Sequence, residues 1–150
     1  MKKIFYFLTI LLMPLFAMAA KEDAFGRWIT ETSSAGANRI IVDIYEKNGK
    51  VYGKIYQLTE RFDDKGELKK DVNNPDKSKQ SRTLEGIDFV SGFVYNDSNN
   101  TYEDGKIYDP STGKTYSCYM VLQENGTLKV RGHLPGLTLI GKTQTWKRYK

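Results

Sequence analysis

Cysteine and histidine are almost missing from this sequence, whose 150 residues contain one of each, Cys118 and His133. A single thiol excludes an internal disulfide, so packing alone must hold the fold together. No local spacing joins the thiol to the imidazole as nucleophile and base, and no histidine-based metal motif is present. We therefore expect no metal and no cofactor, assign no catalytic residue, and expect Cys118 to be a buried strand residue.

Long hydrophobic runs are also missing, since the apolar stretch at residues 4–16 is shorter than a membrane-spanning helix. Two lysines precede this stretch and Ala-Met-Ala follows it, a pattern typical of a signal peptide. We expect residues 1–20 to be removed by cleavage after Ala19 or Ala20. The mature domain, 21–150, would then be periplasmic or secreted, without a membrane span.

A strong excess of one charge is the third missing feature. The chain has 23 basic and 18 acidic residues, and the two lysines of the signal peptide leave 21 basic residues in the mature domain. The lysines are scattered rather than gathered on one predicted face, which argues against a nucleic-acid partner. We expect a monomer or weak dimer whose partner is a small apolar or amphipathic ligand.

What the mature chain does contain is a series of short strands separated by glycine and asparagine, without a helical period. Even spacing and sequential hairpins predict an all-β fold, a single antiparallel up-and-down β-barrel of about eight strands. An open sandwich is the alternative. The predicted strands are residues 26–31, 38–47, 50–59, 87–96, 101–108, 114–123, 127–132 and 137–149.

The first hairpin follows from Asn48-Gly49, the strongest short hairpin signal. A two-residue turn sets Val42 opposite Ile55 and Tyr45 opposite Tyr52. The apolar residues then share one face of the sheet, and tyrosines and charged residues share the other. The predicted inner face holds Ile40, Val42, Ile44, Val51 and Ile55.

A second hairpin surrounds the loop at Gly126. A two-residue turn would separate the apolar residues, whereas a three-residue loop sets Leu122 opposite Leu128 and Met120 opposite Val130. We therefore predict the longer loop, which also puts the single cysteine on the inner face.

Residues 60–83 break the strand pattern, because they are polar, charged and strandless. Loops this long inside a compact domain are usually functional or disordered. Within them, Asp71-Val-Asn-Asn-Pro-Asp76 offers carboxylates and amides on a turn that Pro75 constrains. The chain lacks the full pattern of a calcium-binding loop, so turn capping is the default role.

A second candidate segment is the turn Tyr108-Asp-Pro-Ser-Thr-Gly113. Proline presets the bend, glycine ends it, and Asp109 can accept hydrogen bonds from turn amides. The turn chemistry does not explain the tyrosines at 108 and 116, which would suit a barrel mouth. The predicted ligand-binding residues, from both segments, are Asp71, Asn73, Asn74, Asp76, Tyr108, Asp109 and Tyr116.

The sequence contains six short motifs, which follow one another along the chain in the order GRWIT, GKVYGKIYQL, DVNNPD, DGKIYDPSTGKTYSC, LKVRGH and IGKTQTWKR. These motifs resemble the secreted bacterial family called domain of unknown function 2147, over nearly all of the mature chain. The resemblance implies a small lipocalin-like β-barrel and no established reaction. Lipocalins also open with Gly-x-Trp and end with an arginine over the indole. By that likeness Trp28 closes one barrel end beneath an arginine of the final Trp-Lys-Arg.

Three functions remain open at this point. A carrier of a small ligand requires an open interior lined by apolar side chains. A protein- or glycan-interaction module would have a filled core and would act through residues 60–83 and an aromatic rim. A hydrolase would need Asp71 and Asp109 close enough to act on one substrate.

Overall fold

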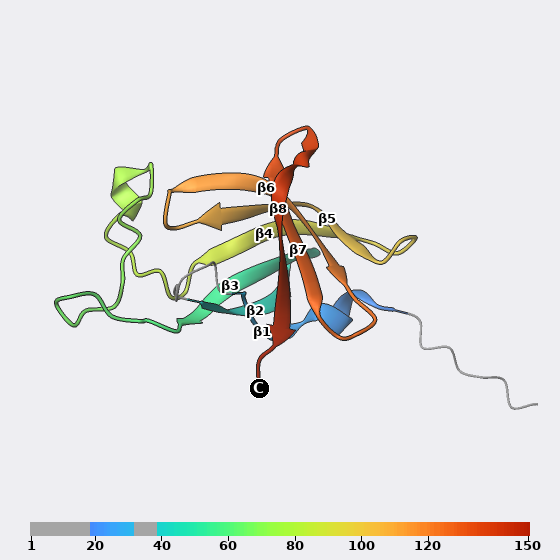
Figure 1. The fold of residues 1–150 in the computed structure, drawn as a ribbon, viewed down its shortest axis with the longest axis horizontal. Helices are drawn as coiled ribbons and strands as arrows, with labels where there is room; N and C mark the ends of the chain where they lie inside the picture. Colours follow the sequence, from blue (N-terminus) through green and yellow to red (C-terminus); the bar gives the residue numbers. More distant parts are fainter. Residues whose placement is uncertain (1–18, 32–38) are drawn as a thin grey trace, which may run out of the picture.

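The computed structural model describes residues 19–31 and 39–150, so the predicted signal peptide lies almost wholly outside the described residues. Figure 1 shows a barrel of antiparallel strands, with one long loop and two short 3-10 helices, η1 (Lys21–Ala24) and η2 (Lys77–Lys79). The strands are β1 (Gly26–Ile29), β2 (Ile40–Lys47), β3 (Lys50–Leu58), β4 (Asp88–Asn96), β5 (Thr101–Asp109), β6 (Lys114–Leu122), β7 (Leu128–Leu134) and β8 (Leu137–Arg148).

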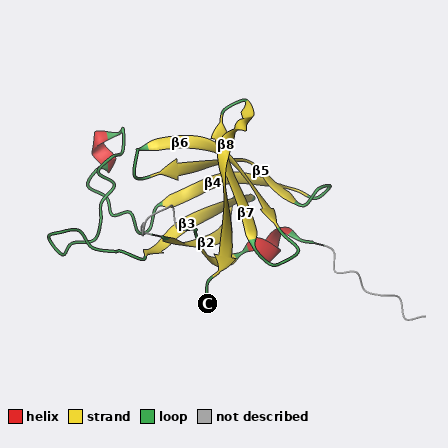
Figure 2. Ribbon diagram, in the orientation of Figure 1, coloured by secondary structure: helices red, strands yellow, loops and turns green. Residues whose placement is uncertain are grey.

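Each strand pairs with the next one in sequence, and β1 pairs with β8 to close the sheet into a barrel (Figure 2). This confirms the predicted up-and-down barrel, and the open sandwich is wrong. The closing contact is short, since it pairs only Trp28 with Arg148 and Ile29 with Lys147. The β3–β4, β5–β6 and β7–β8 connections all lie at one end of the barrel, here called the rim, because successive strands alternate in direction.

Both predicted hairpin registers are confirmed. Val42 pairs with Ile55 and Tyr45 with Tyr52, and on the other hairpin Met120 pairs with Val130. Sequence analysis did not predict the irregularity after Ile41, where the β2–β3 register shifts by one residue.

The end opposite the rim is closed as the Gly-x-Trp likeness implies. Trp28 is fully buried, and its indole Nε1 donates a hydrogen bond of 2.9 Å to the Ala24 carbonyl. The Arg148 guanidinium lies 4.1 Å from the centre of the Trp28 ring. The Tyr102 hydroxyl donates a hydrogen bond of 2.7 Å to the Lys21 carbonyl, and this bond holds η1 across the barrel end. These contacts plug the opening with aromatic rings and one short helix.

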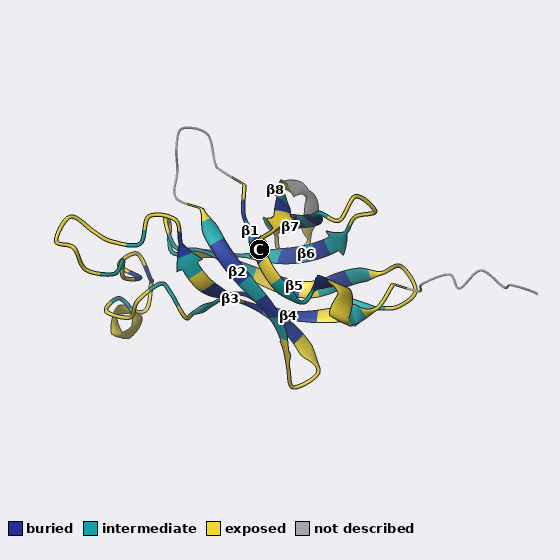
Figure 3. Cartoon of the chain, turned by 90° about the horizontal axis from the view of Figure 1, so that it is seen from below, coloured by how far each residue is buried: buried dark blue, intermediate teal, exposed yellow. Residues whose placement is uncertain are grey.

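Buried residues of the barrel strands form one core cluster, and Figure 3 shows buried stretches in dark blue along the strands. Phe93 fits against Gly105 so closely that a Cβ there would lie 2.2 Å from the ring. Gly53 leaves room for Val90 in the same way, because a Cβ at Gly53 would lie 2.4 Å from the Val90 side chain. Cys118 belongs to this interior, and burial raises the pKa of its thiol to about 12, as expected of an inert core cysteine. Where Phe93 and Val90 lie, the described residues fill the interior, which does not favour the carrier hypothesis at this level.

Candidate functional site

The connection between β3 and β4, residues 59–87, is here called the rim segment. It extends from the barrel beside the β5–β6 hairpin, as the green trace in Figure 1 shows. Two isolated bridges, Phe62 to Leu68 and Lys70 to Thr83, fold it back on itself. The predicted strandless character therefore holds except for these bridges and η2.

A fully buried carboxylate anchors this segment. Asp71 accepts hydrogen bonds from Tyr108 Oη at 2.5 Å, Asn74 Nδ2 at 2.8 Å and Arg82 Nε at 3.0 Å. The Arg82 Nη2 atom also lies 3.0 Å from the carboxylate. Each carboxylate oxygen thus has a donor, and a buried charge needs such pairing. The Asp71 side chain has 0% exposure, and its carboxylate is engaged by these three residues.

Hydrogen bonds and a close backbone contact also join the rim segment to the β5–β6 turn. Asn73 Nδ2 donates to the carbonyls of Pro110 and Ser111, at 3.0 and 3.1 Å. The backbone of Gly113 comes so close that an added Cβ would lie 1.9 Å from the Asn73 carbonyl oxygen. Gly113 also has a φ of +73°, a conformation that glycine adopts freely. The two sequence segments predicted to share the rim therefore lie against each other.

Two of the predicted site residues cap turns. Asp109 accepts a hydrogen bond from the Ser111 amide at 2.9 Å, and Asp76 accepts one from the Ser78 amide at 3.0 Å. Both side chains bend the backbone locally, the default role of aspartate in such turns. For Asp76, the hydrogen bonds from Ser78 hold the carboxyl pKa below its usual value.

Tyr116 does not join this cluster. The register pairs Tyr108 with Thr115 and Ile107 with Tyr116, so the two tyrosines lie on opposite faces of the sheet. Tyr108 is on the outer face with its hydroxyl on Asp71, whereas Tyr116 is on the face of Ile107. The structure therefore does not support the expectation that both tyrosines flank one binding surface.

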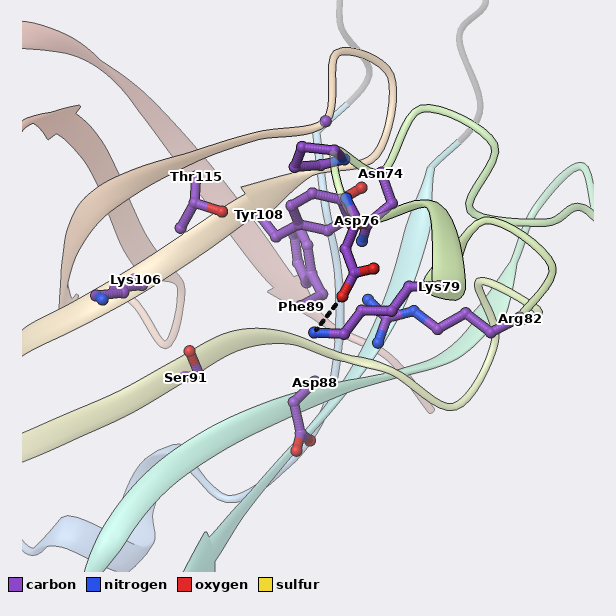
Figure 4. Close-up of a pocket in the computed structure, with 12 residues that line it drawn as sticks. Asn74, Asp76, Lys79, Arg82, Asp88, Phe89, Ser91, Lys106, Tyr108 and Thr115 are labelled. Atoms are coloured by element: carbon purple, nitrogen blue, oxygen red, sulfur yellow. Dashed lines mark hydrogen bonds and ion pairs between the residues drawn. The ribbon is translucent and has the colours of Figure 1, made fainter.

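A pocket of about 410 Å³, here called the wall pocket, lies between the rim segment and the outer face of the barrel. Figure 4 shows Ser91, Lys106 and Thr115 on one side and the rim segment on the other. Its lining residues are Asn74, Pro75, Asp76, Lys79, Arg82, Asp88, Phe89, Ser91, Lys106, Tyr108, Gly113 and Thr115. Of the predicted site residues, Asn74, Asp76 and Tyr108 line it.

Most charges around the wall pocket already have partners. Arg82 is paired with Asp71, Lys79 lies 4.0 Å from Asp76, and Asp88 accepts from Tyr45 at 2.6 Å. By contrast, no hydrogen bond or ion pair within residues 19–31 and 39–150 engages the Lys106 ammonium. The pocket thus offers one uncommitted positive charge.

Burial raises the pKa of Tyr108 to about 12, and its hydrogen bond to Asp71 adds to the rise. The phenol therefore stays protonated at neutral pH and keeps donating to the carboxylate.

Sequence reasoning missed the strand side of this pocket, Ser91, Lys106 and Thr115. The strand period could have put the three on the outer face, because each alternates with an inward apolar residue. No local signal says that the rim segment folds over that face.

The family described as "Uncharacterized protein conserved in bacteria (DUF2147)" matches residues 26–148. This chain belongs to the DUF2147 family. A search of curated proteins gave no match.

A solved structure shares the barrel of this DUF2147 protein. It is HP1028 from Helicobacter pylori, described as belonging to the lipocalin family, with 30% sequence identity and a TM-score of 0.68. The match covers 83% of this chain and 82% of the other. Together with the closed eight-stranded barrel, it establishes a lipocalin-like fold.

Two further tests concern metals and membranes. Within the described ranges, no three histidine, cysteine, aspartate or glutamate side chains gather where they could hold a metal ion. None of the helices described there has the length and hydrophobicity to cross a membrane.

Proposed function

We propose that this DUF2147 protein binds a small, partly apolar acid in the wall pocket, after export from the cytoplasm. The observation that carries the proposal is the uncommitted Lys106 ammonium in a pocket of about 410 Å³, a size usual for small-ligand sites. Pro75 and the ring of Tyr108 supply apolar surface, and the hydroxyls of Ser91 and Thr115 supply hydrogen bonds.

The arrangement of the rim segment supports binding without a large reorganisation. Asp71 and Asn73 fasten the segment to β5 and to the β5–β6 turn. A wall that is already ordered loses little conformational entropy when a ligand binds. The filled core supports this outer pocket over the interior as the ligand site.

Export is supported by the sequence pattern of residues 1–20. In protein isolated from its native host, the intact mass is expected to match a chain that begins at Ala20 or Lys21. A mass that includes Met1, or the initiator-processed form beginning at Lys2, would contradict the signal-peptide proposal.

The pocket can be tested with 8-anilinonaphthalene-1-sulfonate, a fluorescent probe that has an apolar ring system and one negative charge. We expect saturable binding to the mature protein, weakened about five- to tenfold by Lys106→Gln, roughly 1 kcal/mol for the loss of one charge-assisted contact. Binding is followed by the rise in probe fluorescence.

The matched control is Lys50→Gln, which removes the same charge from an exposed position beside the β2–β3 turn, far from the rim. Its affinity for the probe should equal that of the wild type. If the two variants weaken binding equally, the probe senses only net charge and the proposed pocket is wrong.

A further inference from the structure

A second hollow crosses the outer wall of the barrel over β5, β6 and β7, and is here called the outer groove. Its volume is about 610 Å³, and it touches the wall pocket only at Lys106. We propose that the outer groove binds a short oligosaccharide. Its lining residues are Thr101, Glu103, Asp104, Gly105, Lys106, Ser117, Cys118, Tyr119, His133 and Gly136.

An aromatic pair forms part of this groove. The rings of Tyr119 and His133 have centroids 6.2 Å apart and are tilted by 49°. Both side chains are half-buried, so each keeps part of its ring at the surface. A tyrosine combines an apolar ring with a polar tip, which suits the C–H face of a sugar ring and its neighbouring hydroxyls.

The imidazole adds a directed acceptor. His133 Nδ1 lies 2.9 Å from the Leu134 carbonyl oxygen. A carbonyl can only accept, so Nδ1 carries the proton in the neutral ring and Nε2 is left as an acceptor. A ligand hydroxyl can donate to that nitrogen.

The groove also holds a row of hydrogen-bonding groups. Lys106 pairs with Ser117 across β5 and β6, and Ser117 pairs with His133 across β6 and β7. Adjacent strands are about 4.8 Å apart, so the row spans about 10 Å, the length of roughly two sugar units. In the part of the chain that the structure describes, neither Lys106 nor Ser117 has a side-chain hydrogen bond.

A β-bulge directs a carboxylate to the same place. The β5–β6 register shifts between Tyr102 and Gly105, and Asp104 lies in this bulge with a φ of +58°. Bulges re-aim side chains, and Asp104 is exposed along the groove without a side-chain partner among the described residues. A carboxylate has two acceptor oxygens, which match two vicinal sugar hydroxyls.

A peptide is a poorer occupant. Peptides often bind a sheet by adding a strand to its edge, and the strands beneath this groove, β5, β6 and β7, are each paired on both sides. The outer groove instead runs across the strands. The carboxylate, ammonium, hydroxyl and imidazole groups can all form hydrogen bonds with sugar hydroxyls, and the tyrosine ring can pack against the face of a sugar ring.

The test is two-dimensional NMR of the ¹⁵N-labelled mature protein with cellobiose, maltotriose and N,N′-diacetylchitobiose, each at about 10 mM, suited to the weak affinity expected of short sugars. At least one sugar should shift the amide signals of Ser117, Tyr119 and His133 and leave those of Asn74 and Asp76 in place. That pattern would separate this site from the wall pocket, which shares only Lys106 with the outer groove.

Two variants sharpen the test. Tyr119→Ala should weaken sugar binding about tenfold, and Asp104→Asn about five- to tenfold. Asparagine keeps the volume and tolerates positive φ, so the second variant preserves the bulge. Tyr52→Ala removes an outer-face tyrosine from β3, beyond the groove, and should bind like the wild type.

Three results would overturn the proposal. The first is that none of the three sugars shifts the groove signals. The second is that a hexa-aspartate peptide shifts them while the sugars do not, which would assign the groove to acidic peptides. The third is unchanged affinity in both Tyr119→Ala and Asp104→Asn.

Discussion

Replacing Gly105 with alanine is expected to lower the free energy of unfolding by about 3 kcal/mol, at the upper end of overpacking costs. The new Cβ would lie 2.2 Å from two ring atoms of Phe93, whose side chain is fully buried. The ring cannot retreat, because it packs inside a closed wall of strands. Urea denaturation followed by tryptophan fluorescence measures the loss.

The matched control is Gly132→Ala, which also adds an inward Cβ, but its nearest neighbour is the Ile107 Cγ2 methyl, at 3.1 Å. A methyl group that can shift by a few tenths of an ångström should make this change cost less than about 1 kcal/mol. Phe93→Leu should partly relieve Gly105→Ala, with a favourable coupling energy of at least about 1 kcal/mol in a double-mutant cycle. Strict additivity, or equal costs at the two glycines, would show that the interior is looser than the structure indicates.

The hairpins were predictable because their information is local. Asn-Gly fixes a two-residue turn, and the alternation of apolar side chains then leaves one register in which the inner face stays apolar. Pairs such as Val42 with Ile55 follow directly. The closed end was expected only from the likeness to lipocalins, and Trp28 and Arg148 do meet there.

The site was only partly predictable. The Asn-Asn-Pro-Asp and Tyr-Asp-Pro segments lie together as expected, joined through Asn73 and Asp71. The face of each side chain depended on the length of the β5–β6 turn. Because Asp109 pairs with Lys114 around four turn residues, Tyr116 falls opposite Ile107 and away from Tyr108. A slip of one residue in such a register reverses every face.

The role of the rim segment could not be read from its composition. Polar residues at 60–83 are compatible with disorder, and the segment is ordered instead by buried contacts with distant residues, such as Asp71 with Tyr108. Such pairings between separate loops leave no periodic signal. The pocket that they create, with Lys106 in its wall, therefore became visible only in three dimensions.

Asp71→Ala is expected to release the rim segment from the barrel. The substitution leaves Arg82, Asn74 and Tyr108 without their common acceptor, and hydrogen bonds to a charged group each contribute about 1.5–3 kcal/mol. Because the Arg82 side chain of the Asp71–Arg82 pair is partly exposed to water, we expect the substitution to lower the free energy of opening of the segment by about 2–3 kcal/mol in total. Amides of residues 71–82 should exchange roughly thirty- to hundredfold faster.

Hydrogen-exchange mass spectrometry at neutral pH measures this local opening, and the barrel strands should keep their protection because the segment packs outside the core. Binding of the anilinonaphthalene probe should weaken in parallel, since the segment forms one side of the wall pocket. Unchanged exchange at 71–82 would show that Asp71 does not anchor the segment.

The alkaline behaviour of the wild type gives a second measure of the same anchor. The pKa of Tyr108 is raised from its ordinary value of 10 to about 12 by burial and by its hydrogen bond to Asp71. Because the pKa of Tyr108 is raised in the folded protein, the stabilising contribution of this phenol is complete below pH 10 and is lost as the pH rises through 12. Protection of residues 71–82, corrected for intrinsic exchange, should therefore fall across that window in the wild type. In Tyr108→Phe, which has no phenol to ionise, this loss should be absent, and an identical fall would assign the alkaline opening to another group.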